Sequence, residues 1–173
     1  MDFSAFLNGS RETVHALVAL LTGAIAVLLG VAFMISGLKK VVAHGRGERQ
    51  GQPTVGPVLI NLCIGGAMVQ LGTMTDMLVQ TLFGTGRESP NSAMAYMPDP
   101  VQESQLLSQA VEAGVYWVAA IGFIAIIRGL VLWNELAKGA GHGQNLGWKG
   151  FWHLFFGALA VNIPGTLRML AGG

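Results

Sequence analysis

The chain has 173 residues, of which 52% are hydrophobic and only 11% are Asp, Glu, Lys or Arg. About a quarter of a soluble domain is normally charged, so this composition excludes an ordinary soluble fold, and it excludes disorder for the same reason. The net charge of +1 excludes a generally basic surface for nucleic acid. A single cysteine excludes an internal disulfide framework. We therefore expect an all-α membrane protein, with an unusually high count of 25 glycines.

Four apolar stretches predict four hydrophobic helices, because about 20 apolar residues cross a bilayer as a helix. The first runs over residues 14–38 without a charge, and the second runs from about residue 57 to 83. The third covers residues 111–136, and the fourth covers residues 150–170. Pro164 lies inside the fourth stretch and should bend it or mark a break.

The loops between paired helices carry most of the basic residues. The first loop region holds Lys39, Lys40, Arg46 and Arg49, and the second holds Lys138 and Lys149. Because Lys and Arg mark the cytoplasmic side, both loops are predicted to be cytoplasmic and both termini periplasmic. These residues either set the topology alone or face a lumen or lipid phosphates. Neither Gly-rich loop has the spacing of a nucleotide-binding motif.

A shift of 92 residues aligns the chain with itself and indicates a tandem duplication. Identical pairs include Gly30 with Gly122, Gly37 with Gly129, Gly65 with Gly157, Val69 with Val161, and the loop pair Gly51 with Gly143. The predicted units are a first helical hairpin over residues 1–83, an exposed connector over 84–105 and a second helical hairpin over 106–173. Two helices in each unit keep both units in the same orientation.

Glycines recur every seven residues in the first and third helices, which places them near one helix face. In lipid, small residues permit the close approach on which helix packing depends. We therefore predict helix packing at these positions and at the aligned pair in the second and fourth helices. The predicted contacts lie either within one chain or between copies. The helix-packing set is Gly23, Gly30, Gly37, Gly65, Gly122, Gly129 and Gly157.

Three charges lie within or near the ends of the predicted helices. Arg128 lies inside the third helix, where an ionisable residue is costly and usually functional. It reaches a headgroup, faces an aqueous lumen, pairs with another helix, or extends its side chain to the interface. Asp76 and Arg168 occupy equivalent positions in the two units and are a candidate charge pair, within one chain or between copies.

No residue pattern points to catalysis, so we expect a protein that is not an enzyme. His15, His44, His142 and His153 lack the spacing of a metal site, and no Ser or Cys lies in a nucleophile motif. We expect no metal and no cofactor. Cys63 is interpreted as an apolar filler of the second helix.

The unit of helix, short basic loop and helix resembles the conjugative pilin subunits of type IV secretion systems. The glycine spacing and the segment GALAVNIPGTLRML, residues 157–170, are similar to small membrane proteins of the type IVB systems, namely the TraQ, TraR, DotE and DotP proteins. This resemblance implies a membrane-stored subunit that assembles with phospholipid into a helical pilus. An ordinary pilin has one hairpin, whereas this chain has two.

The expected function is therefore that of a structural subunit of a conjugative apparatus in the bacterial inner membrane, able to assemble into an extracellular pilus. Its expected partners are further copies of itself, phospholipid and other apparatus subunits. One alternative is a small inner-membrane transporter or channel that uses Arg128, Asp76 and Glu112. Another is a holin-like pore or an accessory assembly protein.

Overall fold

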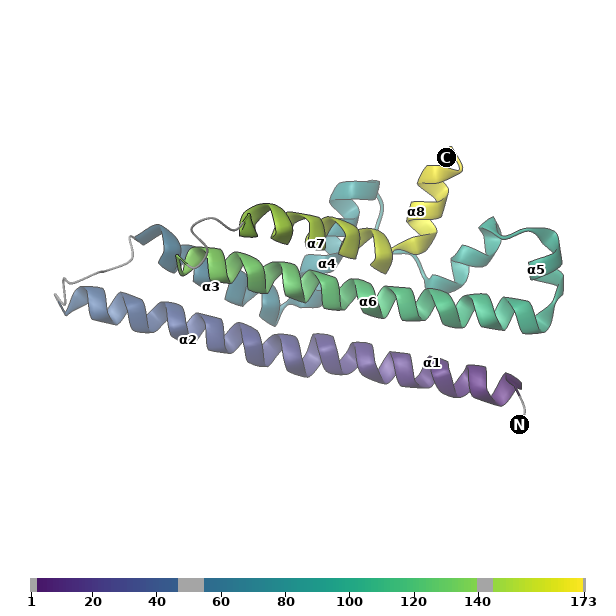
Figure 1. Ribbon diagram of the computed structural model, residues 1–173, viewed down its shortest axis with the longest axis horizontal. Coiled ribbons are helices and arrows are strands. Elements are labelled where there is room, and N and C mark those ends of the chain that lie inside the picture. The colour runs from purple at the N-terminus through teal and green to yellow at the C-terminus, as the bar shows by residue number, and fades with distance from the viewer. Residues whose placement is uncertain (1–2, 47–54, 140–144, 173) are drawn as a thin grey trace.

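The computed structural model describes residues 3–46, 55–139 and 145–172, and every regular element within these ranges is a helix (Figure 1). The elements in chain order are α1 (Phe3–Ala19), the π-helical turn η1 (Leu20–Ile25), α2 (Ala26–Gly45), α3 (Val55–Val69), α4 (Leu71–Phe83), the 3-10 helix η2 (Pro90–Tyr96), α5 (Asp99–Glu103), α6 (Gln105–Ala137), α7 (Leu146–Val161) and α8 (Ile163–Leu170).

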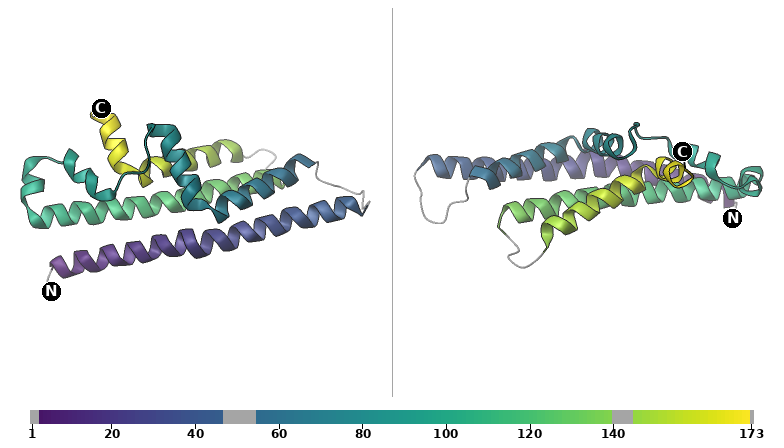
Figure 2. Two further views of the ribbon diagram at one scale, coloured as in Figure 1. Left: turned by 180° about the vertical axis from the view of Figure 1, so that it is seen from behind. Right: turned by 90° about the horizontal axis from the view of Figure 1, so that it is seen from above.

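Two long helices run side by side (Figures 1 and 2). The first joins α1, η1 and α2 without a break, and the second is α6, whose N-terminus is capped by the Ser104 hydroxyl accepting from the Leu107 N–H at 3.4 Å. Both are longer than the predicted helices. Ala5–Ala43 and Gln105–Ala137 are long and apolar enough to cross a bilayer, which is consistent with membrane association.

The second predicted helix is not continuous. α3 and α4 are separated by Gln70 and meet at an angle of 96°. The prediction of one helix from residue 57 to 83 is therefore wrong. Taken as one broken span, the pair would be a third membrane-crossing segment. No proline lies at this break to indicate it in the sequence.

The fourth predicted helix is broken at the equivalent place, at Asn162 between α7 and α8. Pro164 lies in the first turn of α8, so the predicted break is confirmed. Proline lacks an N–H and disfavours helical conformation in the residue before it. The Asn162 carbonyl accepts from the Thr166 N–H at 2.9 Å, as the Gln70 carbonyl accepts from the Met74 N–H at 2.9 Å.

The long helices are each covered by the helix that follows them. α3 packs on α2, and α7 packs on α6, while α1 and α3 also contact α6. α4 and α8 both turn away from the long axis on the same side (Figure 1). The core lies where the first half of the chain meets α6, and its largest fully buried side chains are Met68, Leu71, Ile126 and Leu130.

Most of the segment predicted as an exposed connector is exposed, but it is not unstructured. It contains η2 and α5, and η2 contacts α6 and α8. Ala93 is fully buried in consequence. The connector therefore fixes the ends of two helices as well as linking the two halves of the chain.

Candidate functional site: helix contacts and the charged junction

The first glycine contact joins α2 to α3. A Cβ on Gly30 would lie 2.6 Å from the Gly65 carbonyl oxygen and 2.8 Å from the Val69 nitrogen. In the other direction, a Cβ on Gly65 would lie 2.8 Å from the Gly30 carbonyl oxygen. Each glycine thus faces the backbone of the other helix, which no other residue allows without separating the two helices.

The second glycine contact joins α6 to α7 with the same partners, moved by 92 residues. A Cβ on Gly122 would lie 2.8 Å from the Gly157 carbonyl oxygen and 2.8 Å from the Val161 nitrogen. A Cβ on Gly157 would lie 2.9 Å from the Gly122 carbonyl oxygen. The contact geometry is therefore shared by the two halves of the chain, as well as the identity of the residues.

A further contact in each half lies one heptad along the long helix. A Cβ on Gly37 would lie 3.1 Å from a methyl carbon of Leu62, and a Cβ on Gly129 would lie 2.9 Å from Leu154. Gly129 also faces Gly150, whose own Cβ would overlap the Trp133 ring. The 92-residue repeat does not reveal Gly150, because valine occupies the aligned position in the first half.

Gly23 is the exception among the predicted packing glycines. It is exposed, and nothing lies within 4 Å of a Cβ placed on it. Gly23 lies in the π-helical turn Leu20–Ile25, and α3 ends at Val69 opposite Gly30 before α4 turns away at 96°. A π turn holds more residues than an α turn, so Gly23 is rotated away from the face that carries Gly30 and Gly37. Its predicted role in packing within the chain is wrong.

Most of the predicted lipid- or lumen-facing basic residues lie at the surface. Lys39, Arg46, Arg128, Lys138 and Lys149 are exposed and Lys40 is half-buried, while Arg49 lies outside the described residues. The Lys138 ammonium lies 5.2 Å from the centre of the Phe33 ring and so connects the end of α6 to α2. Arg128 shares the outward face of α6 with the exposed residues Ile121 and Ile124.

Asp76 and Arg168 each pair with a residue of the connector rather than with each other. Asp76 lies 3.6 Å from the Arg87 guanidinium, and Arg168 lies 2.6 Å from the Glu88 carboxylate. Arg87 and Glu88 are adjacent in the chain. The predicted intramolecular pair is replaced because the connector passes between α4 and α8.

Glu88 also forms a hydrogen bond at the break between α7 and α8. Its backbone N–H donates to the Asn162 side-chain oxygen at 2.9 Å, and Asn162 is fully buried. Sequence reasoning missed Arg87 and Glu88, because they lie in a turn-rich segment without periodicity. The sequence feature that could have indicated them is the pair of adjacent, opposite charges in a chain with few charged residues.

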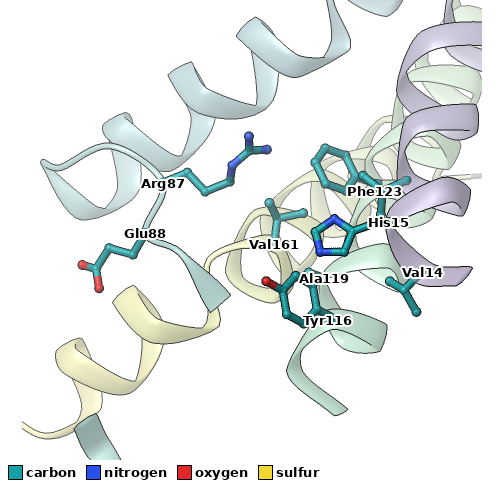
Figure 3. A pocket seen from close by; sticks show the side chains of 9 residues that line it. Val14, His15, Arg87, Glu88, Tyr116, Ala119, Phe123 and Val161 are labelled. Carbon is teal, nitrogen blue, oxygen red and sulfur yellow. The ribbon is translucent and has the colours of Figure 1, made fainter. Parts of the chain in front are cut away.

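A cavity of about 200 Å³ lies where α1, α6, α7 and the connector meet. Its walls are mainly apolar, with Val14, Phe123 and Val161 among them, and Arg87 and Glu88 come from the connector (Figure 3). Figure 3 shows the Arg87 side chain pointing toward Phe123, with the guanidinium carbon 5.7 Å from the ring centre. Arg87 thus covers this end of the core rather than presenting a reactive group.

Beside the cavity, α1 is fastened to α6 by a two-bond charge pair. The Arg11 guanidinium nitrogens lie 2.9 Å and 3.0 Å from the two Glu112 oxygens. The Trp117 ring N–H donates to the Ser10 hydroxyl at 2.8 Å. Sequence reasoning considered Glu112 only as a pathway residue, whereas here it joins two helices.

Reversing either charge of this pair should loosen α1 from α6. We expect Glu112→Arg to lower the free energy of unfolding in detergent by about 2 kcal/mol, because a part-buried Arg11 would lose a bidentate partner. The double variant Arg11→Glu with Glu112→Arg should recover most of that loss. Glu135→Arg, on an exposed position of the same helix, is the matched control. A double variant as unstable as the sum of the single ones would contradict the pairing.

Within the described ranges, no group of three His, Cys, Asp or Glu side chains is placed to hold a metal ion. His142 and the His44 side chain lie outside those ranges. The features that stand out chemically are therefore backbone contacts between helices, surface cations and apolar faces. No protein-family model, no curated protein and no solved structure matches this chain.

Proposed function

We propose that this chain is a non-enzymatic structural subunit of a conjugative type IV secretion apparatus, most concretely a pilin-like protein that polymerises with phospholipid. The observation that carries the proposal is the repeated glycine contact, Gly30 on Gly65 and Gly122 on Gly157. Two units that reproduce one backbone-to-backbone contact are expected of a duplicated hairpin. A subunit with two tandem hairpins already holds two of the units that a polymer of hairpins would repeat.

The proposal includes the tandem arrangement of the two hairpins. Three further features support duplication. The helix that follows each long helix is broken at an aligned residue, Gln70 or Asn162, and a short helix leaves each break on the same side. Both long helices also run in one direction (Figure 2). In the membrane-stored form, both basic loops would be cytoplasmic, and both termini would be periplasmic.

Phospholipid is the proposed non-protein component. Arg128 is exposed on an apolar face of α6, where Ile121 and Ile124 are its exposed neighbours. A guanidinium offers two parallel donors that match a phosphate, so a headgroup would satisfy Arg128 at the edge of a lipid-covered face. The loop residues Lys39 and Lys149 would contact phosphates at the cytoplasmic surface or line a lumen.

A small transporter or channel is the second candidate, and the broken helices favour it, because transporters often bind substrate at such breaks. The three residues proposed for its pathway weigh against it. Glu112 is paired with Arg11, Asp76 lies beside Arg87, and Arg128 faces outward from α6. They are thus not gathered at one break.

The test is electron microscopy of filaments sheared from cells that express the chain with a small epitope at its C-terminus. We expect labelled filaments, and lipid extraction of the purified filaments should recover phospholipid. Epitope found only in the detergent-extracted inner membrane would contradict the pilin proposal. Expression without the rest of the apparatus is the control, because an assembled pilus requires extraction of the subunit from the membrane.

A further inference from the structure

One stripe of α6 is buried because the first half of the chain covers it. Its members are spaced by three and four residues, which places them on one helix face. Phe123, Ile127 and Leu130 belong to the core together with Ile64 and Met68 of α3. The whole buried stripe is Ala120, Phe123, Ile127, Leu130 and Asn134.

The aligned stripe of α2 has the same spacing and lies at the surface. Leu28 is 71% exposed where its counterpart Ala120 is 1% exposed, and Leu38 is 52% exposed where Leu130 is 2% exposed. In the most apolar 18-residue window of each long helix, 17% of the residues are buried in the first long helix and 50% are buried in α6. The whole exposed stripe is Leu28, Val31, Ile35, Leu38 and Val42.

One α3 residue that belongs to the core beside α6 has an exposed counterpart in α7. Ile64 of α3 is 6% exposed, whereas the aligned Phe156 of α7 is 57% exposed. Phe156 stacks on Trp152 at a centroid distance of 5.2 Å, and both belong to an aromatic ridge along α7. The ridge comprises Trp148, Phe151, Trp152, Phe155 and Phe156.

We infer that Phe156, at the end of the aromatic ridge of one copy, packs on the α2 stripe of the next copy, and so takes between chains the place that the aligned Ile64 of α3 has in the core beside α6 inside each chain. In each chain the junction between α3 and α6 is formed, whereas the α2 stripe and the surface around Phe156 stay uncovered. Such a contact is head-to-tail, so it generates a ring or an open helical filament. The inference rests on the proposed function and names the surface through which the subunit would polymerise.

The residues themselves favour a second copy as the occupant. Two stripe positions are identical in the two long helices, Ile35 with Ile127 and Leu38 with Leu130. In the internal junction Ile64 belongs to one core with Ile127 and Leu130 of α6, whereas the aligned Phe156 is exposed.

Disulfide cross-linking between two differently tagged chains tests the contact. Both chains carry Cys63→Ser, one carries Leu38→Cys, and the other carries Phe156→Cys. Both changed positions are exposed, so the fold should tolerate them, and far-UV circular dichroism checks this. After co-expression and oxidation in membranes, we expect the mixed dimer to exceed either like-with-like dimer at least fivefold. The control pairs Phe156→Cys with Ile121→Cys, an exposed position on the outward face of α6.

Each outcome is decisive. A dominant dimer through Leu38→Cys alone would show a two-fold contact and overturn the inference. Cross-linking no better than the Ile121→Cys control would show that lipid covers the stripe, and would also overturn it. Filaments without the mixed cross-link would leave the proposed function standing and remove this interface. The mixed cross-link in membranes without any filament would support the interface and remove the pilin function.

Discussion

Replacing Gly122 with alanine should separate α6 from α7 and lower the free energy of unfolding by about 2–3 kcal/mol, in the range of overpacked cores. The added Cβ would lie 2.8 Å from the Gly157 carbonyl oxygen and 2.8 Å from the Val161 nitrogen. Both are backbone atoms, so a rotamer change cannot relieve the overlap. Denaturant unfolding in detergent micelles, followed by circular dichroism, measures the effect. Gly30→Ala should behave alike, because its contact is equivalent.

The matched control is Gly114→Ala in the same helix, where nothing lies within 4 Å of the added Cβ. Glycine weakens a helix interior by roughly 1 kcal/mol relative to alanine, so this variant should be neutral or slightly more stable. Gly23→Ala is the second control, since Gly23 shares the heptad spacing but makes no such contact. Equal losses in Gly122→Ala and Gly114→Ala would show that the glycine contact is not what joins the helices.

Replacing Asn162 with alanine should release the connector from the break between α7 and α8. The side-chain oxygen accepts from the Glu88 backbone N–H, and the whole residue is buried. A buried donor left without a partner costs about 1–3 kcal/mol. We expect a loss of this size in unfolding experiments and faster hydrogen exchange at the Glu88 amide. Arg168, which pairs with Glu88, should become more mobile by the same change.

Gln70→Ala is the control for this variant, because Gln70 breaks the first return helix at the aligned position but is exposed. It should leave both the unfolding free energy and the Glu88 exchange rate nearly unchanged. An unchanged Glu88 exchange rate in Asn162→Ala would contradict the role of the side chain in holding the connector.

Contacts that recur along a helix could be predicted from the spacing of residues. The seven-residue interval correctly indicated Gly30, Gly37, Gly122 and Gly129, because helix packing in lipid selects small residues at a fixed interval. The same interval was misleading at Gly23, since a π turn changes the rotation per residue and no residue type in the sequence marks such a turn. Composition likewise predicted long apolar helices.

The connector and the breaks depend on contacts that have no period. Pro164 indicated the second break, whereas Gln70 has no proline beside it, so the first break was not predicted. Within one chain Asp76 and Arg168 pair with Arg87 and Glu88 and not with each other, which the repeat alone could not indicate. A long-range pair of this kind depends on the path of the connector.

The two breaks also limit the length of α3 and α7, the helices that follow the two long helices. α7 has 16 residues, which at a rise of about 1.5 Å per residue gives a straight limb of about 24 Å. The hydrocarbon core of a bilayer is about 30 Å thick, and α6 with its 33 residues exceeds it. A straight helix of the length of α7 is therefore too short to cross such a core by itself. If α6 crosses a bilayer, the shorter α7 leaves a hydrophobic mismatch beside it, and contact between subunits would be one way to relieve that mismatch.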